Sequence, residues 1–242
     1  MKVKYYSTRN ALSYIFFLLF LVSFVLLIGS VYKSSKDKVE AKRRKDSFIK
    51  IMKKAKTPKE EIEFLQKEYN NKNILGILSI PSLDIYQPVV KGKDNYFYLN
   101  RGLDNKYLLE GSIFLDYRNS INDKQINVYG HSAPDIVLDF NKLFKYRDKD
   151  FLAKNKEVLL KINNEIVKYE VIYTIPTHDN EEHMHLNFKS DGAWLKHYNA
   201  LRSLSEHKDV KLNANDEILV MQTCLQGREK GMKLAIVARR IK

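Results

Sequence analysis

Two side chains that can act together as a nucleophile and a proton carrier stand at the ends of two apolar runs in this chain. Cys224, the single cysteine of the sequence, ends the run Ile218-Leu219-Val220-Met221-Gln222-Thr223, and His131 ends a shorter run that begins at Gln125. Runs of this kind predict strands. A thiol and an imidazole at two strand ends are a common arrangement for a Cys/His nucleophile pair. A lone cysteine is more often a small buried hydrophobe without chemistry, so the rest of the sequence has to decide.

The composition favours one domain of ordinary size with an appendage. The chain has 242 residues, of which 44% are hydrophobic and 12% aromatic, so a sizeable core is available. A single cysteine excludes an internal disulfide framework but does not identify the compartment. The formal net charge of +13 raises the question of nucleic-acid binding. Residues 1–60 carry +11 of that charge and residues 61–242 only +2, so we expect no nucleic-acid partner.

The segment 11–32 is a candidate membrane span. Its 22 residues carry no charge and are dominated by Leu, Phe, Val and Ile. At about 1.5 Å per residue, a helix of this length crosses a hydrocarbon core of roughly 30 Å. The run is longer than the apolar region of a signal peptide, and no small-x-small cleavage site follows before Lys33. The sequence therefore predicts a short tail over residues 1–10 and an uncleaved, single-pass signal anchor over residues 11–32.

A basic segment follows the span and bears on its orientation. Three basic residues precede the span, and seven follow it between residues 33 and 45. Taken alone, the positive-inside rule predicts that the C-terminal side is cytoplasmic. Residues 33–70 are expected to form a basic helical stalk, interrupted near Thr57-Pro58, where proline suits a first helical turn. This stretch either lies against anionic lipid headgroups or is a solvated stalk.

Residues 71–242 are expected to form a mostly β domain. A helix is predicted over residues 192–205, and Asn163-Asn164 is a hairpin signal. Several short strands separated by turn signals favour a barrel or a sandwich. The predicted strands cover residues 74–80, 85–90, 112–116, 125–129, 158–162, 166–175, 217–223 and 233–241.

Several motifs in this order resemble those of a sortase. They are Tyr129-Gly130-His131, Thr223-Cys224 at a strand end, and a basic residue that opens the final strand. The segments 88–99 and 111–119 (Gly-Ser-Ile-Phe-Leu-Asp-Tyr-Arg-Asn), with the helix-bearing insertion before the Cys224 strand, are similar to those of class B. The resemblance covers roughly residues 70–242. It implies an eight-stranded sortase-type β-barrel with inserted helices, preceded here by N-terminal helices and one transmembrane helix.

The resemblance also implies an activity and a location. Sortases are cysteine transpeptidases on the outer face of Gram-positive membranes, and they cleave a C-terminal sorting signal of secreted proteins through a thioacyl enzyme. For class B the signal is similar to Asn-Pro-x-Thr-Asn, and the acceptor amine belongs to a peptidoglycan precursor; a pilin amine is the other possible acceptor. The resemblance places the catalytic domain outside, against the charge count. We follow it because the acceptors and the secreted substrates are found there; no cofactor is expected.

The catalytic roles are carried over residue by residue. Cys224 resembles the nucleophile, which acts as a thiolate, and His131 resembles the group that protonates the departing amine and deprotonates the incoming one. Sortases usually place an arginine at the start of the last strand, where it donates hydrogen bonds to the oxyanion. The matching residue here is Lys233, which keeps the charge but lacks the planar fork of donors. Arg228 in the preceding loop is the alternative, whereas Arg239 lies too far along the strand.

The two residues that directly precede the cysteine are candidates for substrate binding. They are Thr223 and Gln222, and the family often has a small hydroxyl residue at the position of Gln222. The histidines His178, His183 and His185 suggest a metal site, but no cysteine or well-spaced carboxylate set accompanies them. We therefore expect no metal.

Three interpretations of the whole chain remain open at this point. The first is an active class B-like sortase that uses Lys233 or Arg228. The second is a weakly active or inactive homologue that binds sorting signals. The third is a non-enzymatic membrane-anchored scaffold in which Cys224 is only a packing residue.

Overall fold

The computed structural model describes residues 6–52, 54–131, 139–177, 182–224 and 233–241. It divides into two compact units, Met1–Lys53 and Lys54–Lys242. The first unit is the helix α1 (Tyr6–Met52). The second holds the strands and the remaining helices.

Helix α1 contains the predicted apolar segment. Within it, Leu12–Tyr32 is 21 residues long, has a mean hydropathy of 2.7 and is exposed throughout. By length and composition this segment can cross a membrane. The helix continues without a break through the basic residues to Met52. A second helix, α2 (Pro58–Glu68), begins at the predicted proline, where the Thr57 hydroxyl accepts a hydrogen bond from the backbone N–H of Glu60 (3.2 Å).

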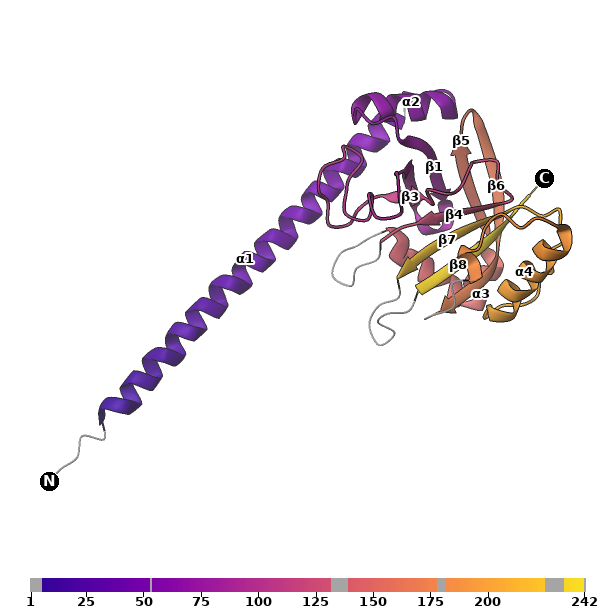
Figure 1. Ribbon diagram of the computed structural model, residues 1–242. Helices are drawn as coiled ribbons and strands as arrows, with labels where there is room; N and C mark the ends of the chain where they lie inside the picture. The colour runs from indigo at the N-terminus through magenta and orange to yellow at the C-terminus, as the bar shows by residue number, and fades with distance from the viewer. Residues whose placement is uncertain (1–5, 53, 132–138, 178–181, 225–232, 242) are drawn as a thin grey trace. The chain divides into compact units, whose positions relative to one another are not determined.

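The second unit is a closed barrel of eight strands, as predicted (Figure 1). The strands follow one another around the barrel in the order β1-β2-β3-β4-β7-β8-β6-β5. Two neighbouring pairs, β2/β3 and β4/β7, are parallel, and the other neighbours are antiparallel. The strands are β1 (Ile74–Ile80), β2 (Ile85–Lys91), β3 (Ile113–Leu115), β4 (Gln125–Tyr129), β5 (Glu157–Ile162), β6 (Glu165–Thr177), β7 (Ile218–Cys224) and β8 (Lys233–Arg240).

The predicted hairpin joins β5 to β6. Ile162 pairs with Glu165, so the loop between them is Asn163-Asn164. Asn163 has φ 54°, a left-handed conformation that asparagine tolerates better than most residues. This turn fixes the register of β5 against β6.

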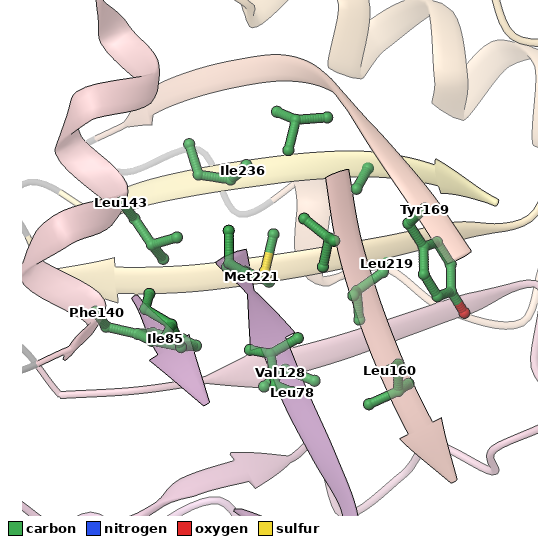
Figure 2. Close-up of a cluster of buried hydrophobic side chains, with 14 of the residues drawn as sticks. Leu78, Ile85, Val128, Phe140, Leu143, Leu160, Tyr169, Leu219, Met221 and Ile236 are labelled. Carbon is green, nitrogen blue, oxygen red and sulfur yellow. The ribbon is translucent and has the colours of Figure 1, made fainter. Parts of the chain in front are cut away.

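The barrel interior is filled by large apolar side chains (Figure 2). Leu219 and Met221 of β7 enter it beside Val128 of β4 and Ile236 of β8. Phe140 and Leu143, from the 3-10 helix η2 (Asp139–Arg147), close the core at one end. Since each of these side chains is at most 4% exposed, the strands that carry them are held in a single register.

A second apolar cluster covers the outer faces of three strands. Helix α4 (Asp191–Leu204) packs beside β6, with Trp194, Tyr198 and Leu201 buried against outward residues such as Val220 and Val237. Strands β7 and β8 are therefore buried on both faces, which explains their continuous apolar sequences. The predicted helix over residues 192–205 corresponds to α4.

Four short elements were not predicted from the sequence. They are the 3-10 helices η1 (Pro81–Leu83), η2 and η3 (Glu182–Met184), and the helix α3 (Lys149–Lys154). None of them has more than nine residues, which is too short for a helical period to be recognised in the sequence.

Candidate active site

Strand β7 carries Cys224 as its last residue. Its side chains alternate between the two apolar clusters, with Leu219 and Met221 in the barrel and Ile218 and Val220 under α4. The next inward position is Thr223, which is 2% exposed and whose hydroxyl has no hydrogen-bond partner in the described part of the chain. The Thr223 side chain therefore faces the barrel interior and not the outer face of β7. A strand packed on both faces fixes the backbone at its end.

Strand β4 brings His131 level with Cys224. The two strands are parallel, and Tyr129 pairs with Gln222. Beyond that pair, the Gly130 N–H donates to the Gln222 carbonyl oxygen (3.1 Å), so the pairing continues past the end of β4. Two further residues along each chain lead to His131 and Cys224. Neighbouring strands lie about 4.8 Å apart, so the register brings these two predicted residues together.

Strand β8 places Lys233 on the other side of Cys224. The two residues are direct partners in the antiparallel β7/β8 pairing. Cys224 and Lys233 are thus paired across β7 and β8, and His131 lies two residues beyond the end of β4, the neighbour of β7 on its other side; these three residues are called the row below. Arg239 pairs with Ile218 at the opposite end of β7 and forms an ion pair with Glu170, so it is remote from the cysteine as expected. Arg228 lies outside the described residues.

Gln222 lies on the outer face, one row below Cys224. Its side chain is half-buried, and its amide oxygen is hydrogen-bonded to Nε2 of His183 in η3. His183 itself is 1% exposed. The side chain predicted to bind substrate is thus also in contact with the segment inserted between β6 and β7.

The backbone of His183 rests on two amide side chains of β4. Gln125 Nε2 and Asn127 Nδ2 donate to the His183 carbonyl oxygen at 2.7 and 3.1 Å. Gln125 Oε1 is 2.7 Å from Nε2 of His197 in α4. These contacts hold both η3 and α4 against the outer face of β4.

His197 is a buried titratable group within this network. Its Nδ1 lies 3.0 Å from Glu182 Oε1, and the residue is 1% exposed. Burial lowers the pKa of His197 below its ordinary value of 6.5, and the Glu182 carboxylate opposes part of that shift.

A buried carboxylate, Asp116, is hydrogen-bonded to Tyr129, the last residue of β4. It is fully buried and accepts hydrogen bonds from Tyr129 Oη (2.8 Å), Arg118 Nε (2.9 Å) and Asn95 Nδ2 (3.1 Å). Burial alone would raise the pKa of Asp116, but the hydrogen bonds, led by those from Arg118, outweigh it and lower the pKa. Arg118 also donates to the carbonyl oxygen of Met184 (3.1 Å), so this cluster contacts η3 as well.

The histidines considered for a metal site differ in their surroundings. His183 is buried against Gln222, whereas His185 is exposed and His178 lies outside the described residues. Within the described residues, no group of three or more His, Cys, Asp and Glu side chains could hold a metal ion.

Sequence reasoning missed the contacts that Gln125, Asn127, His183 and His197 make with one another. One signal was present, because Gln125 and Asn127 alternate with apolar residues in a predicted strand. Polar residues on a covered strand face require hydrogen-bond partners. The partners themselves lie more than 50 positions away in the sequence, so no local pattern identifies them.

A closed eight-stranded barrel with a cysteine at the end of β7 and a histidine just after β4, the parallel neighbour of β7, is typical of a sortase-type protein. No protein-family model matches the chain. Sortase B of Staphylococcus aureus is 26% identical to it over 234 residues, which is 91% of this chain and 93% of that protein. Sortase B of Listeria monocytogenes is 30% identical over 169 residues, 69% of this chain and 68% of that protein.

The similarity extends to solved structures. A Staphylococcus aureus sortase B–substrate complex superposes with a TM-score of 0.73 at 25% identity, covering 85% of this chain and 98% of that chain. The chain belongs to the sortase B family.

Proposed function

We propose that this chain is a membrane-anchored cysteine transpeptidase. It cleaves a C-terminal sorting signal of secreted proteins and transfers the protein to an amine. The observation that carries this proposal is the pairing of Cys224 with Lys233 across β7 and β8, together with His131 two residues beyond β4, the parallel neighbour of β7. Membership of the sortase B family supports it, since sortases are cysteine transpeptidases.

The first half of the reaction forms the thioacyl enzyme. The Cys224 thiolate adds to the carbonyl carbon of the residue before the scissile bond, and the carbonyl oxygen becomes an oxyanion. The oxyanion collapses, the C–N bond breaks, and protonated His131 donates its proton to the departing amine. A thioester to Cys224 and a neutral His131 remain.

The second half reverses these roles. The acceptor amine adds to the thioester carbon while neutral His131 accepts its proton, and the C–S bond breaks to restore the thiolate. In this proposal Lys233, the register partner of Cys224, donates hydrogen bonds to the oxyanion in both halves. The acceptor is an amine of a peptidoglycan precursor or of a pilin. The Staphylococcus aureus sortase B solved with its substrate supports a peptide as the donor.

In this proposal the catalytic domain is tethered to the membrane surface by the N-terminal helix. Residues 1–10 form a tail, 11–32 the anchor, 33–70 a basic stalk and 71–242 the catalytic domain, which lies on the extracellular face. The exposed apolar helix Leu12–Tyr32 supports the anchor, and the basic residues after it are suited to contact with anionic lipid.

The experiment that tests this proposal traps the nucleophile. Asn-Pro-x-Thr peptides, mixed at position x and ending in a chloromethyl ketone, should alkylate Cys224, as detected by mass spectrometry. Cys224→Ser should give no adduct, and His131→Ala should slow its formation. A folded chain that forms no adduct would leave only the scaffold interpretation. An adduct without cleavage of matching Asn-Pro-x-Thr-Asn peptides would identify a homologue that binds sorting signals but does not turn them over.

A further inference from the structure

The inserted segment that contains η3 reaches within one row of the predicted nucleophile. Its residue His183 lies over the outer face of β4 and β7, because its carbonyl oxygen accepts from Gln125 and Asn127 while its ring contacts Gln222. Gln222 and Cys224 are separated by one intervening residue of β7. Positions so related share a face of the strand and lie about 7 Å apart.

Gln222 stands at a boundary on the outer face of β7. Val220, two residues before it, is covered by α4 and is 1% exposed. Gln222 is half-buried, so part of its side chain meets solvent. A peptide that extends along β7 from a scissile carbonyl at Cys224 would reach this exposed part within about two residues, because peptide residues have the same spacing of about 3.3–3.4 Å as strand residues.

His183 has little freedom to leave its place. The residue is 1% exposed, two amide donors fix its carbonyl oxygen, and Arg118 fixes the carbonyl oxygen of the next residue, Met184. Because the backbone of His183 is fixed, its ring can restrain the more flexible side chain of Gln222. A free glutamine side chain loses on the order of 1.5–2 kcal/mol of rotamer entropy when it is ordered.

We propose that His183 is a positioning residue that acts through Gln222: its ring holds the Gln222 amide on the outer face of β7, where the sorting signal would bind next to Cys224. This proposal rests on the proposed transpeptidase function and adds a specificity determinant to it. The role is matched to this chain, since Gln222 stands where the family often has a small hydroxyl residue. A short side chain at that position would not reach the imidazole.

The physical consequence concerns binding more than chemistry. Without the His183 ring, the Gln222 amide loses its buried partner and its side chain moves freely at the entrance to the row. A substrate must then order or displace it, which raises KM. The row of His131, Cys224 and Lys233 is set by strand pairing and not by His183, so kcat is largely retained.

A double-mutant cycle tests the proposal. KM and kcat are measured with a mixture of fluorogenic Asn-Pro-x-Thr-Asn peptides and triglycine as acceptor, for the parent, His183→Ala, Gln222→Ala and the double variant. We expect each single substitution to raise KM about fivefold with kcat within about twofold, and the double variant to be no worse than either single one. His183→Gln, which replaces the ring N–H by an amide N–H donor, should recover part of the loss. His185→Ala, an exposed histidine in the same segment, is the matched control and should leave KM unchanged.

The outcomes separate the two proposals. If the parent cleaves the peptides but the two KM effects multiply in the double variant, or His183→Ala leaves KM unchanged, the positioning role is wrong. If the parent neither cleaves the peptides nor forms the chloromethyl ketone adduct, the transpeptidase function itself fails. Thermal unfolding of each variant identifies any that do not fold. His183→Gln then takes the place of His183→Ala in the cycle.

Discussion

At the scale of single residues, the lysine beside the predicted nucleophile is the main departure from the sortase pattern. Lys233 is the register partner of Cys224, the position at which a donor can reach the oxyanion of an acyl group on that cysteine. A lysine offers one compact ammonium group on a flexible stem, whereas an arginine offers a rigid fork of donors.

Lys233→Arg is therefore expected to be at least as active as the parent. Lys233→Ala should lower kcat by about 10²- to 10³-fold, the usual loss for one oxyanion donor. Steady-state cleavage of Asn-Pro-x-Thr-Asn peptides measures both, with Lys196→Ala on the exposed side of α4 as the control. If activity disappears in Arg228→Ala but survives in Lys233→Ala, the role belongs to Arg228 instead.

The sequence located the row of candidate residues but not the contacts that support it. Cys224 and His131 could be identified because each follows an apolar run, and Lys233 because it opens the last strand. Their roles stay predictions, but the pairing places Lys233 beside Cys224, and the parallel strand next to β7 ends two residues before His131. The contact between His183 and Gln222 could not be predicted, since it depends on how the insertion folds back onto the barrel. A histidine in a polar stretch looks the same whether it is exposed or buried.

At the scale of elements, the end of β4 shows how the fold determines one residue of the Tyr-Gly-His motif. Gly130 lies between Tyr129 and His131, and a Cβ at this position would overlap the ring of Phe140. Phe140 is 1% exposed and belongs to η2, which closes the barrel core. The glycine thus allows η2 to pack directly beneath the backbone that carries His131.

Gly130→Ala should destabilise the protein and also impair the site. Overpacking of a well-filled core costs about 1–3 kcal/mol, and relief of the overlap moves either Phe140 or the backbone before His131. We expect a lower midpoint of thermal unfolding and slower alkylation of Cys224. The matched control is Gly192→Ala in α4, where an added Cβ meets no atom within 4 Å. That change should be neutral or stabilising by up to about 1 kcal/mol, and equal effects at both glycines would contradict this account.

The elements themselves were largely predictable. The eight strands were found from apolar runs and turn residues, and 74–80 and 125–129 have the predicted bounds. The strand predicted over residues 112–116 is shorter in the structure, and the one over 166–175 is longer. Strand ends depend on pairing with neighbours rather than on local sequence. For the same reason, the turns of η2 and η3 became evident only once the barrel gave them a surface to pack on.

At the scale of the whole molecule, the open question is on which side of the membrane the barrel lies. The basic residues after the apolar segment favour the cytoplasm by the positive-inside rule. That rule applies best to short loops, and long domains are translocated largely regardless of their charge. The unit that follows the helix, Lys54–Lys242, is long and compact. Its size, together with the substrates proposed for it, is why we propose the extracellular side against the charge count.

The single cysteine makes this orientation measurable. A charged maleimide that does not cross membranes, applied to intact Gram-positive cells that express the chain, should label Cys224, because the barrel is proposed to lie outside. Cells expressing Cys224→Ser should show no labelling of the chain, since the sequence has no other cysteine. Permeabilised cells report whether the thiol reacts at all, and labelling there should equal that in intact cells. Labelling that appears only after permeabilisation would place the barrel in the cytoplasm, as the charge count predicts. It would also remove secreted proteins and cell-wall amines from the reach of Cys224.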